Sequence, residues 1–304
     1  MKILGPEETA ALLPYERLVE GIGDAVRRRA AGEVTVPDRL HIGLGTAGTL
    51  LVMPAADDAL AITKLVTVHP ANSGTDLATI QGEVVALDAR TGRRLAVLDG
   101  ATVTGRRTAA ASALAARILR PGLRGPVLIV GAGAQARAHL EAFHAVFGVD
   151  VFFLCSRTPE RARELARHAR TLGLDVTVVA AVEDVLGETS VVVTATTSRE
   201  PVIASGVRED ALVLAVGAYR HDMAEVDPDV VARCELVVVD DMQGARAEAG
   251  DLLRAVARGV WSFASASTLQ DIVLSPREAP GLTLYKSVGH ALFDLAACRV
   301  ALGV

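Results

Sequence analysis

The chain has 304 residues, of which 51% are hydrophobic and only 3% aromatic, and its formal net charge is -5. This length suits two domains or one large one, with a core of small and branched side chains. The mild negative charge argues against a nucleic-acid partner, which requires a basic face, and the lack of a signal core or a long apolar run predicts a cytoplasmic protein without a membrane span.

The first third of the chain changes from helical to strand-like patterns. Residues 1–33 are predicted to be helical after Gly5-Pro6, because apolar residues recur there at helical spacing. Turn signals then separate short apolar runs, at residues 45–48, 57–58, 72–74 and 91–92. The predicted strands are 40–44, 49–53, 60–68, 79–87 and 95–98. We expect an antiparallel, sheet-rich region here and not a βαβ unit.

A helix rich in small residues is predicted over 108–119, and residues 120–125 form the expected linker to the next domain. From 126 to 280 strand and helix patterns alternate, which favours a parallel, doubly wound α/β sheet. The predicted strands are 127–130, 151–155, 175–179, 191–194, 212–216 and 236–239. Crossover helices are expected at 162–171 and 182–186, and a single helix over 282–302 closes the chain.

The strongest motif follows the first of these strands. The apolar run that starts at Pro126 ends in Gly131-Ala-Gly-Ala-Gln-Ala136, and a helical pattern comes next. Gly131 allows a tight turn, Gly133 lets a pyrophosphate approach the backbone, and Ala136 lets the helix pack closely. The helix start then favours phosphates, so we assign Gly131, Gly133, Ala134 and Gln135 to a dinucleotide cofactor. The alternative is a tight strand–helix turn without a ligand.

The end of the second strand selects the nucleotide in such a Rossmann sheet. An acid there binds a ribose 2′-hydroxyl, whereas an arginine accommodates a 2′-phosphate. Here the strand 151–155 is followed by Ser156-Arg157-Thr158, with no acid at its tip. We therefore predict NADPH, with NADH as the alternative, held in part by these three side chains. A helix N-cap flanked by ordinary surface arginines is the other interpretation of the hydroxyls.

Three cations in the first half stand out from their apolar surroundings. Arg39 follows Val36-Pro-Asp, Lys64 lies inside a strand-like run, and Arg107 begins the small-residue helix. A lysine among β-branched residues is costly to bury without an anion. Each cation alone is explained by an extended side chain or a structural ion pair, but together they can hold a small carboxylate.

At this point the chain resembles the ornithine cyclodeaminase/mu-crystallin family. The matching text includes Pro37-Asp-Arg39, Ala61-Ile-Thr-Lys64, Thr104-Gly-Arg-Arg-Thr-Ala-Ala110, Gly131-Ala-Gly-Ala-Gln-Ala136 and Ser287-Val-Gly-His-Ala-Leu-Phe-Asp294. The resemblance implies a homodimer. It also implies a sheet-rich substrate-binding and dimerisation domain over 1–120, completed by 282–304, and a Rossmann domain over 121–281. By the same resemblance Arg39, Lys64 and Arg107 bind the substrate carboxylate, and Lys64 and Arg107 are catalytic.

One position bears on the branch of this family. Cyclodeaminases carry an aspartate shortly after an Ala-Val-Gly motif, and here Tyr219 takes its place after Ala215-Val-Gly. A tyrosine, with a pKa near about 10, is a poor base at neutral pH. The departure points to NAD(P)H-dependent reductases of cyclic ketimines, acting on Δ1-pyrroline-2-carboxylate or Δ1-piperideine-2-carboxylate to give proline or pipecolate.

We therefore predict a ketimine reductase of proline metabolism, in which Tyr219 lines the substrate pocket and Thr194 and Val216 contact the cofactor. The alternatives are an ornithine or lysine cyclodeaminase, an alanine-type amino-acid dehydrogenase, and a non-catalytic NADPH-dependent binding protein. No metal site is expected, because the histidines lack metal-ligand spacing and the three cysteines form no close pair. His290 and Asp294, four residues apart, are interpreted as a structural hydrogen bond.

Overall fold

The computed structural model describes residues 1–45, 48–72 and 75–304. Two of the predicted turns, at 45–48 and 72–74, therefore lie partly outside the described residues. The chain divides into two compact units. The first comprises Met1–Ala111 and His290–Val304, and the second comprises Ser112–Gly289.

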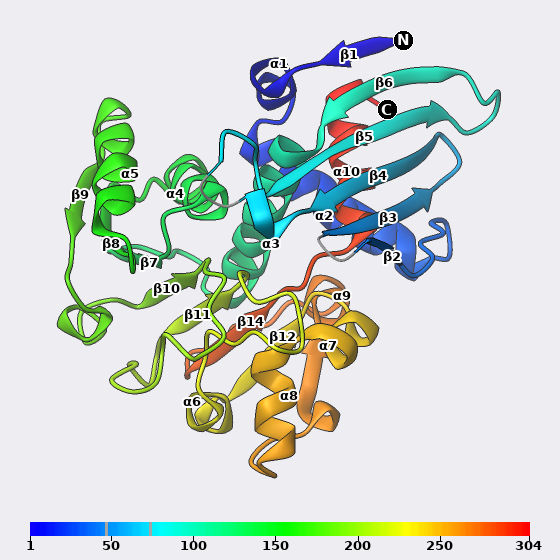
Figure 1. The fold of residues 1–304 in the computed structure, drawn as a ribbon. Coiled ribbons are helices and arrows are strands. Elements are labelled where there is room, and N and C mark those ends of the chain that lie inside the picture. The colour runs from blue at the N-terminus through cyan, green and yellow to red at the C-terminus, as the bar shows by residue number, and fades with distance from the viewer. Residues whose placement is uncertain (46–47, 73–74) are drawn as a thin grey trace. The chain divides into compact units, whose positions relative to one another are not determined.

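The first unit is built on a six-stranded sheet in the order β1-β6-β5-β4-β3-β2 (Figure 1). Its strands are β1 (Lys2–Leu4), β2 (Leu40–Leu44), β3 (Gly48–Ala56), β4 (Leu60–Val68), β5 (Ile80–Asp88) and β6 (Arg94–Asp99). All pairs from β2 to β6 are antiparallel, as predicted, while β1 joins the edge parallel to β6. β1 was not predicted, because three residues are too few to show a period.

Helices of the first unit pack against one face of this sheet. Residues 1–33 form α1 (Pro6–Ala11) and α2 (Tyr15–Ala30), with the break at Pro14. The last helix, α10 (Ala291–Leu302), packs on α2 and on β3 and β4. Gly21 makes this close approach possible, since a Cβ there would lie 2.7 Å from Val300 Cγ2. Leu60, Ile62 and Lys64 alternate on the buried side of β4, so the pleat points Lys64 towards the helices.

The second unit contains an eight-stranded sheet in the order β13-β12-β14-β11-β10-β7-β8-β9, and all neighbouring strands in it run parallel. Its strands are β7 (Val127–Val130), β8 (Val151–Cys155), β9 (Asp175–Val178), β10 (Val191–Thr194), β11 (Leu212–Ala215), β12 (Leu236–Val239), β13 (Ala266–Thr268) and β14 (Thr283–Lys286). The apolar runs of the central strands are buried throughout, as expected of a parallel sheet covered on both faces. The predicted α/β class is thus confirmed.

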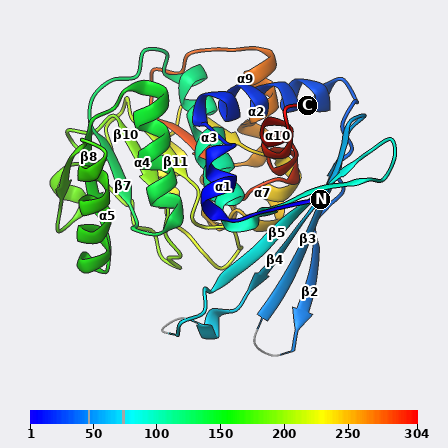
Figure 2. The same ribbon diagram turned by 90° about the horizontal axis from the view of Figure 1, so that it is seen from above.

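The long helix α3 (Gly100–Leu119) leads from the first unit into the second. In the second unit α4 (Ala134–Phe147) packs on β7 and β10, and α5 (Pro159–Thr171) packs on β8 and β9 (Figure 2). The shorter helices are α6 (Pro228–Arg233), α7 (Met242–Glu248), α8 (Gly250–Ala257) and α9 (Leu269–Leu274). The crossover helix expected at 182–186 is only a 3-10 turn, Val182–Asp184.

The predicted helix over 282–302 is wrong in its first part. Thr283–Lys286 is β14, which pairs with β11 on one side and β12 on the other. A short apolar run is compatible with either a buried strand or a helix, and here pairing in the sheet decides. The two compact units divide the chain after Ala111 and after Gly289, whereas the predicted domains divided it after residues 120 and 281. Within the described ranges, no helix is both long and apolar enough to span a membrane.

Candidate functional site

Two of the predicted cations meet on one buried carboxylate in the first unit. The Lys64 ammonium on β4 lies 3.0 and 2.8 Å from the two carboxylate oxygens of Asp294 on α10. Arg107 Nε on α3 donates to Asp294 Oδ1 at 3.1 Å. Lys64 is 2% exposed and Asp294 is fully buried. One negative charge thus faces two positive ones, which leaves the cluster with a net positive charge.

Burial and neighbouring charges set the protonation of this cluster. Burial lowers the pKa of Lys64 to about 8, and the positive charges of Arg107 and Arg39 act in the same direction while Asp294 opposes them. Burial alone would raise the pKa of Asp294, but Lys64 and Arg107 together hold it below its usual value. Arg39, half-buried just before β2, is therefore close enough to act on Lys64. At neutral pH the cluster holds a charged lysine whose proton is easily released.

Asp294 was not predicted as a member of this site. His290 is the N-cap residue of α10, and its Nδ1 accepts a hydrogen bond from Leu292 N at 3.2 Å. Asp294 instead pairs with cations from two other elements. The sequence does contain a signal for it, since Asp294 is the single acid in a helix whose residues, apart from Arg299, are apolar, and a buried charge requires a partner.

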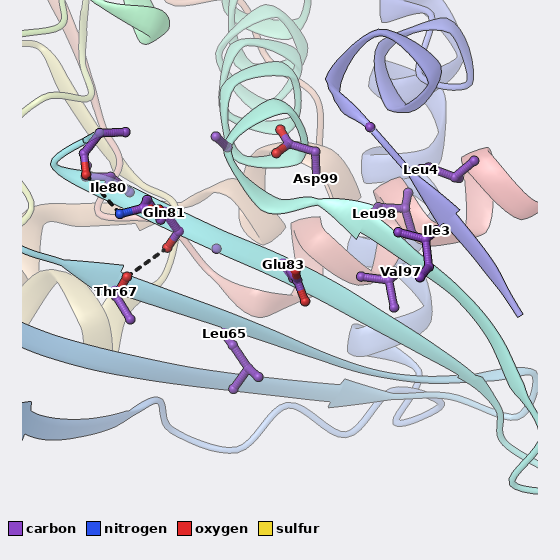
Figure 3. A pocket seen from close by; sticks show the side chains of 14 residues that line it. Ile3, Leu4, Leu65, Thr67, Ile80, Gln81, Glu83, Val97, Leu98 and Asp99 are labelled. Atoms are coloured by element: carbon purple, nitrogen blue, oxygen red, sulfur yellow. Dashed lines mark hydrogen bonds between the residues drawn. The ribbon is translucent and has the colours of Figure 1, made fainter. Parts of the chain in front are cut away.

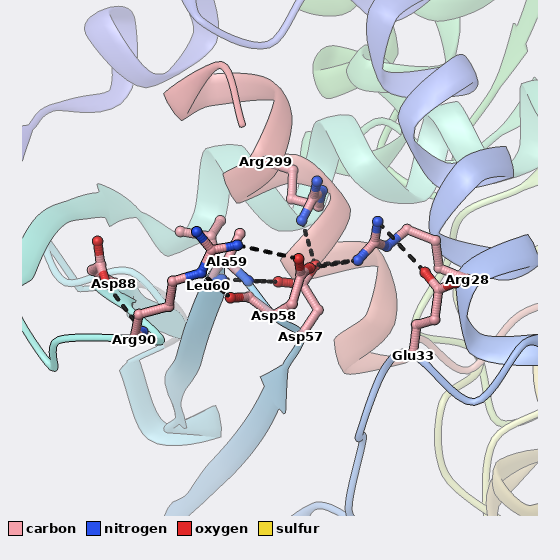
Figure 4. A network of polar contacts seen from close by, with 9 residues as sticks. All are labelled: Arg28, Glu33, Asp57, Asp58, Ala59, Leu60, Asp88, Arg90 and Arg299. Atoms are coloured by element: carbon pink, nitrogen blue, oxygen red, sulfur yellow. Dashed lines mark hydrogen bonds and ion pairs between the residues drawn. The ribbon is translucent and has the colours of Figure 1, made fainter.

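A second network fixes the other end of α10 (Figure 4). Asp57, in the turn between β3 and β4, accepts hydrogen bonds from Ala59 N at 2.9 Å and Leu60 N at 2.8 Å. Arg299 of α10 donates to the same carboxylate at 2.5 Å, and Arg28 of α2 lies 4.0 Å from it. The turn before β4 is thereby tied to α10. This contact holds the strand that carries Lys64 at a fixed position relative to the helix that carries Asp294.

The glycine turn of the second unit has the geometry that a dinucleotide requires. Gly131 adopts a φ of +121°, and a Cβ there would lie 2.4 Å from Ala195 O. Gly133 is the N-cap of α4, has no side-chain cap, and faces open space where a Cβ would be. The first N–H groups of a 14-residue helix are thus left accessible beside a backbone that a phosphate can approach. These residues fit a bound pyrophosphate.

The other predicted cofactor residues lie at the same edge of the sheet. Ser156 follows β8, Thr194 ends β10 and Val216 follows β11, and these strands flank β7 or lie next to its neighbour. Ala134 and Gln135 are in the first turn of α4. Among the described residues the buried hydroxyl of Thr194 has no hydrogen-bond partner. Arg157 and Thr158 are exposed, and Thr158 is the N-cap of α5 without a side-chain cap bond.

Tyr219 is half-buried in the segment after β11, and burial raises the pKa of its phenol. It therefore stays neutral at physiological pH and is no base. Asp222, the nearby acid, is held by Arg220 through two contacts at 2.9 and 3.0 Å, and Arg199 lies 3.6 Å from it. The carboxylate of Asp222 is thus already paired with two arginines.

A hollow of about 530 Å³ lies on the other face of the first sheet (Figure 3). It is lined by residues of β1, β4, β5 and β6, among them Ile3, Leu65, Gln81 and Val97. Leu65 and Lys64 are neighbours in β4 and so point to opposite faces. The hollow is therefore separate from the Lys64 cluster.

The parallel sheet and the glycine turn are those of a nucleotide-binding Rossmann unit, and the chain adds a second, mostly antiparallel sheet that carries the buried cation cluster. The model of the ornithine cyclodeaminase/mu-crystallin family matches residues 3–302, and the chain belongs to that family, as predicted. It is 42% identical over 299 residues to the Δ1-pyrroline-2-carboxylate/Δ1-piperideine-2-carboxylate reductase of Azospirillum brasilense, covering 97% of this chain and 93% of the relative.

Two solved structures extend the comparison. The Δ1-pyrroline-2-carboxylate reductase of Thermococcus litoralis, in complex with NADH and L-proline, superimposes with a TM-score of 0.93 at 27% identity, covering 100% of this chain and 97% of that one. An archaeal alanine dehydrogenase dimer with bound NAD gives a TM-score of 0.89 at 28% identity, covering 100% and 95%.

Proposed function

We propose that this protein is an NAD(P)H-dependent reductase of cyclic ketimine carboxylates, acting on Δ1-pyrroline-2-carboxylate or Δ1-piperideine-2-carboxylate. The observation that carries the proposal is the buried Lys64–Asp294–Arg107 cluster. Its net positive charge favours a carboxylate, and its lysine has a pKa of about 8. The 42% identity to a reductase of these imines supports the same substrates.

Each cation has a role in this proposal. Arg107, with Arg39 beside the cluster, binds the substrate carboxylate, because a guanidinium matches a carboxylate through two parallel hydrogen bonds. Lys64 donates the proton that the ring nitrogen takes up, and it regains a proton from solvent after turnover. Asp294 keeps Lys64 charged before that transfer, since its negative charge raises the pKa of the lysine. The nicotinamide cofactor supplies the hydride to the C=N carbon.

The cofactor proposed is NADPH. Ser156, Arg157 and Thr158 follow β8 with no acid among them, and the exposed guanidinium of Arg157 suits a 2′-phosphate. The reductase from Thermococcus litoralis holds NADH, so NADH is the alternative. Arg157→Ala is expected to weaken NADPH binding about tenfold, a typical effect of one lost charge-assisted hydrogen bond, while NADH binding stays unchanged. Equal losses for both cofactors would contradict the choice of NADPH.

A homodimer formed through the open face of the first sheet is also proposed. Cross-strand pairs place Leu40, Val52 and Leu65 in one row, with Ile42 and Leu50 in the next, and Leu40, Ile42 and Leu65 are exposed. Contiguous exposed apolar surface of this kind marks an interaction site. The similar archaeal alanine dehydrogenase is a dimer. The first unit would then bind substrate and dimerise, the second would bind the cofactor, and the protein would act in the cytoplasm.

The test is a panel of substrates with the purified protein. The two imines, ornithine, and pyruvate with ammonia are each offered with NADPH and with NADH. Oxidation of reduced cofactor with either imine supports the proposal. Ammonia release from ornithine would indicate a cyclodeaminase, and reduction that requires pyruvate with ammonia an alanine-type dehydrogenase, for which the similarity to the archaeal enzyme is the supporting observation. Cofactor binding without any turnover would indicate a binding protein.

Variants then assign the activity to the cluster. Lys64→Met removes the proton donor and is expected to lower kcat about 10²- to 10⁴-fold, the usual contribution of general acid–base catalysis. Arg94→Ala removes an exposed cation from β6 of the same sheet and should leave kcat unchanged. Normal turnover by Lys64→Met, with thermal unfolding that shows an intact fold, would remove Lys64 from the mechanism.

A further inference from the structure

Glu225 is a fully buried acid that belongs to neither the cation cluster nor the glycine turn. Its Oε1 accepts hydrogen bonds from Thr196 N at 2.6 Å and from the Thr196 hydroxyl at 2.9 Å. Its Oε2 accepts from Gly217 N at 2.7 Å and Ala218 N at 3.0 Å. Four donors thus converge on one carboxylate. Two belong to the segment after β10 and two to the segment after β11.

These two segments lie at the edge where doubly wound sheets bind a dinucleotide. The chain adds β8 and β9 on one side of β7 and then crosses to β10 on the other, so the strand order reverses between β7 and β10. Ligands of such sheets bind beyond the carboxyl ends of the strands at that reversal. The glycine turn after β7 suits the pyrophosphate, and the adenosine side lies towards β8. The segments after β10 and β11 are left for the nicotinamide end.

The two segments also pack against each other without space for adjustment. A Cβ on Gly217 would lie 2.1 Å from Thr196 O, and a Cβ on Gly131 would lie 2.4 Å from Ala195 O. The glycine turn, the segment after β10 and the segment after β11 are therefore in successive backbone contact. A displacement at Glu225 would be transmitted along this row.

Glu225 is itself held in place from behind. Asp251 Oδ1 accepts from Glu225 N at 2.5 Å and from Val226 N at 2.8 Å, and Lys286 Nζ lies 2.7 Å from Asp251 Oδ2. Burial raises the pKa of the Glu225 carboxyl, while Lys286 and the backbone N–H groups of Thr196 and Ala218 act in the opposite sense. All four of the hydrogen bonds from Thr196, Gly217 and Ala218 require an acceptor, which the ionised carboxylate provides.

We propose that Glu225 is a positioning residue for the nicotinamide end of the cofactor, because one carboxylate fixes the segments that follow β10 and β11. The inference rests on the proposed nicotinamide cofactor and goes beyond it by assigning its orientation to a residue outside the cation cluster. Glu225 contacts neither substrate nor cofactor in this proposal. It acts through Thr196, Gly217 and Ala218.

Glu225→Gln tests this with little change in shape. An amide has a single oxygen, so it can accept from Thr196 or from Gly217 and Ala218, but its NH₂ group then faces donors at the other segment. One of the two tethers is lost. We expect the dissociation constant of the tighter-binding cofactor to rise about tenfold, as for the loss of one hydrogen bond to a charged group. The adenosine fragment of that cofactor, 2′,5′-ADP for NADPH or ADP for NADH, should bind as it does to the wild type.

Both constants are measured by calorimetric titration of the full chain without substrate. Thr189→Val is the matched control, since Thr189 is a fully buried residue at the opposite end of β10 whose hydroxyl donates to Val185 O at 3.1 Å. It should lower thermal stability and leave both dissociation constants unchanged. If Glu225→Gln does not fold, Thr196→Val removes one of the four donors with a smaller perturbation. It should weaken binding of the whole cofactor and leave binding of the adenosine fragment unchanged.

Selective loss of the whole cofactor supports the proposal. Unchanged cofactor binding in a folded Glu225→Gln variant, or equal losses for cofactor and fragment, would overturn it and leave the proposed reductase standing. If the wild type binds neither nicotinamide cofactor, the proposed function fails together with this inference.

Discussion

Lys64 lies in an environment unlike that of a free side chain in water. It is buried beside one acid and two cations, and its pKa falls from an ordinary value of 10.5 to about 8. A lysine with that pKa is charged at neutral pH yet releases its proton readily, which suits a general acid. The same side chain at the protein surface would hold its proton far more tightly.

This pKa predicts how activity depends on pH. The charged form of Lys64 is the proposed donor, so kcat/KM should be highest below pH 8 and fall as the pH rises through about 8. Asp294 raises the pKa of Lys64, so Asp294→Asn should move that fall to lower pH. The pH profiles of kcat/KM are compared between wild type and variant with the same imine, because the titration of the substrate then affects both profiles equally. Asp58→Asn, which changes an exposed acid of the same unit, should leave the profile as it is.

A fall at the same pH in Asp294→Asn and wild type would show that another group limits the rate. The cluster would then only bind the substrate carboxylate, through Arg107. The pH profile therefore separates the two roles that the cluster combines.

At the scale of elements, the turn between β7 and α4 contains one glycine that the fold requires and another that the proposed cofactor requires. Gly131 has a φ of +121° and no space for a Cβ, whereas Gly133 is extended and faces open space. Gly131→Ala should lower the free energy of unfolding by at least about 1–3 kcal/mol, the cost of a strained backbone. Gly133→Ala should lower the free energy of unfolding by less than about 1 kcal/mol. It should weaken cofactor binding at least about tenfold, because the added Cβ would occupy the space proposed for the pyrophosphate.

Urea unfolding measures the free energy of unfolding of each variant, and titration measures its affinity for the cofactor. Gly131→Ala should show the larger loss of stability, and Gly133→Ala should show the loss of affinity. If Gly133→Ala kept full affinity for both nicotinamide cofactors, the phosphates would lie elsewhere. If Gly131→Ala were as stable as the wild type, the turn would tolerate a side chain that the contact with Ala195 excludes.

The connection of α10 to the β3–β4 turn is the second element-scale feature. Asp57→Ala removes the acceptor for Ala59 N and Leu60 N and the partner of Arg299. We expect a loss of about 1–3 kcal/mol in the free energy of unfolding, since donors at a partly buried turn lose their acceptor. Asp58→Ala removes a neighbouring acid that is 62% exposed and should cost less than about 1 kcal/mol. Equal losses in the two variants would mean that the Asp57 network contributes no more than a surface pair.

At the scale of the whole molecule, the proposed dimer depends on the open face of the first sheet. Leu65 ends the row that it forms with Leu40 and Val52, and it is 38% exposed. Leu65→Asp should raise the dissociation constant of the dimer at least about 100-fold, roughly 3 kcal/mol, because a charge would be buried at the interface. Leu172→Asp changes a leucine of similar exposure at the end of α5 and should leave the dimer intact. Sedimentation velocity over a range of concentrations measures both, and a monomeric wild type would contradict the proposal.

The sequence by itself determined those features that depend on neighbours in the chain. The strands at 40–44, 60–68, 127–130, 151–155, 191–194 and 236–239 have the bounds that were predicted. The glycine turn after β7 was also predicted, because the positive φ of Gly131 and its close contact with the backbone of Ala195 restrict that position to glycine. The family followed from motifs spread over nearly the whole chain.

Only the tertiary structure decided which charges meet. Lys64 and Asp294 are 230 positions apart, and Glu225 joins segments that follow two different strands. The four residues of β14 carry no period of their own, so the sequence pattern does not separate them from the helix that follows, and they form a strand only between β11 and β12. The physical reason is common to these cases. A local pattern can show that a charge or a short apolar run must be buried, but the partner that stabilises it comes from a distant part of the chain.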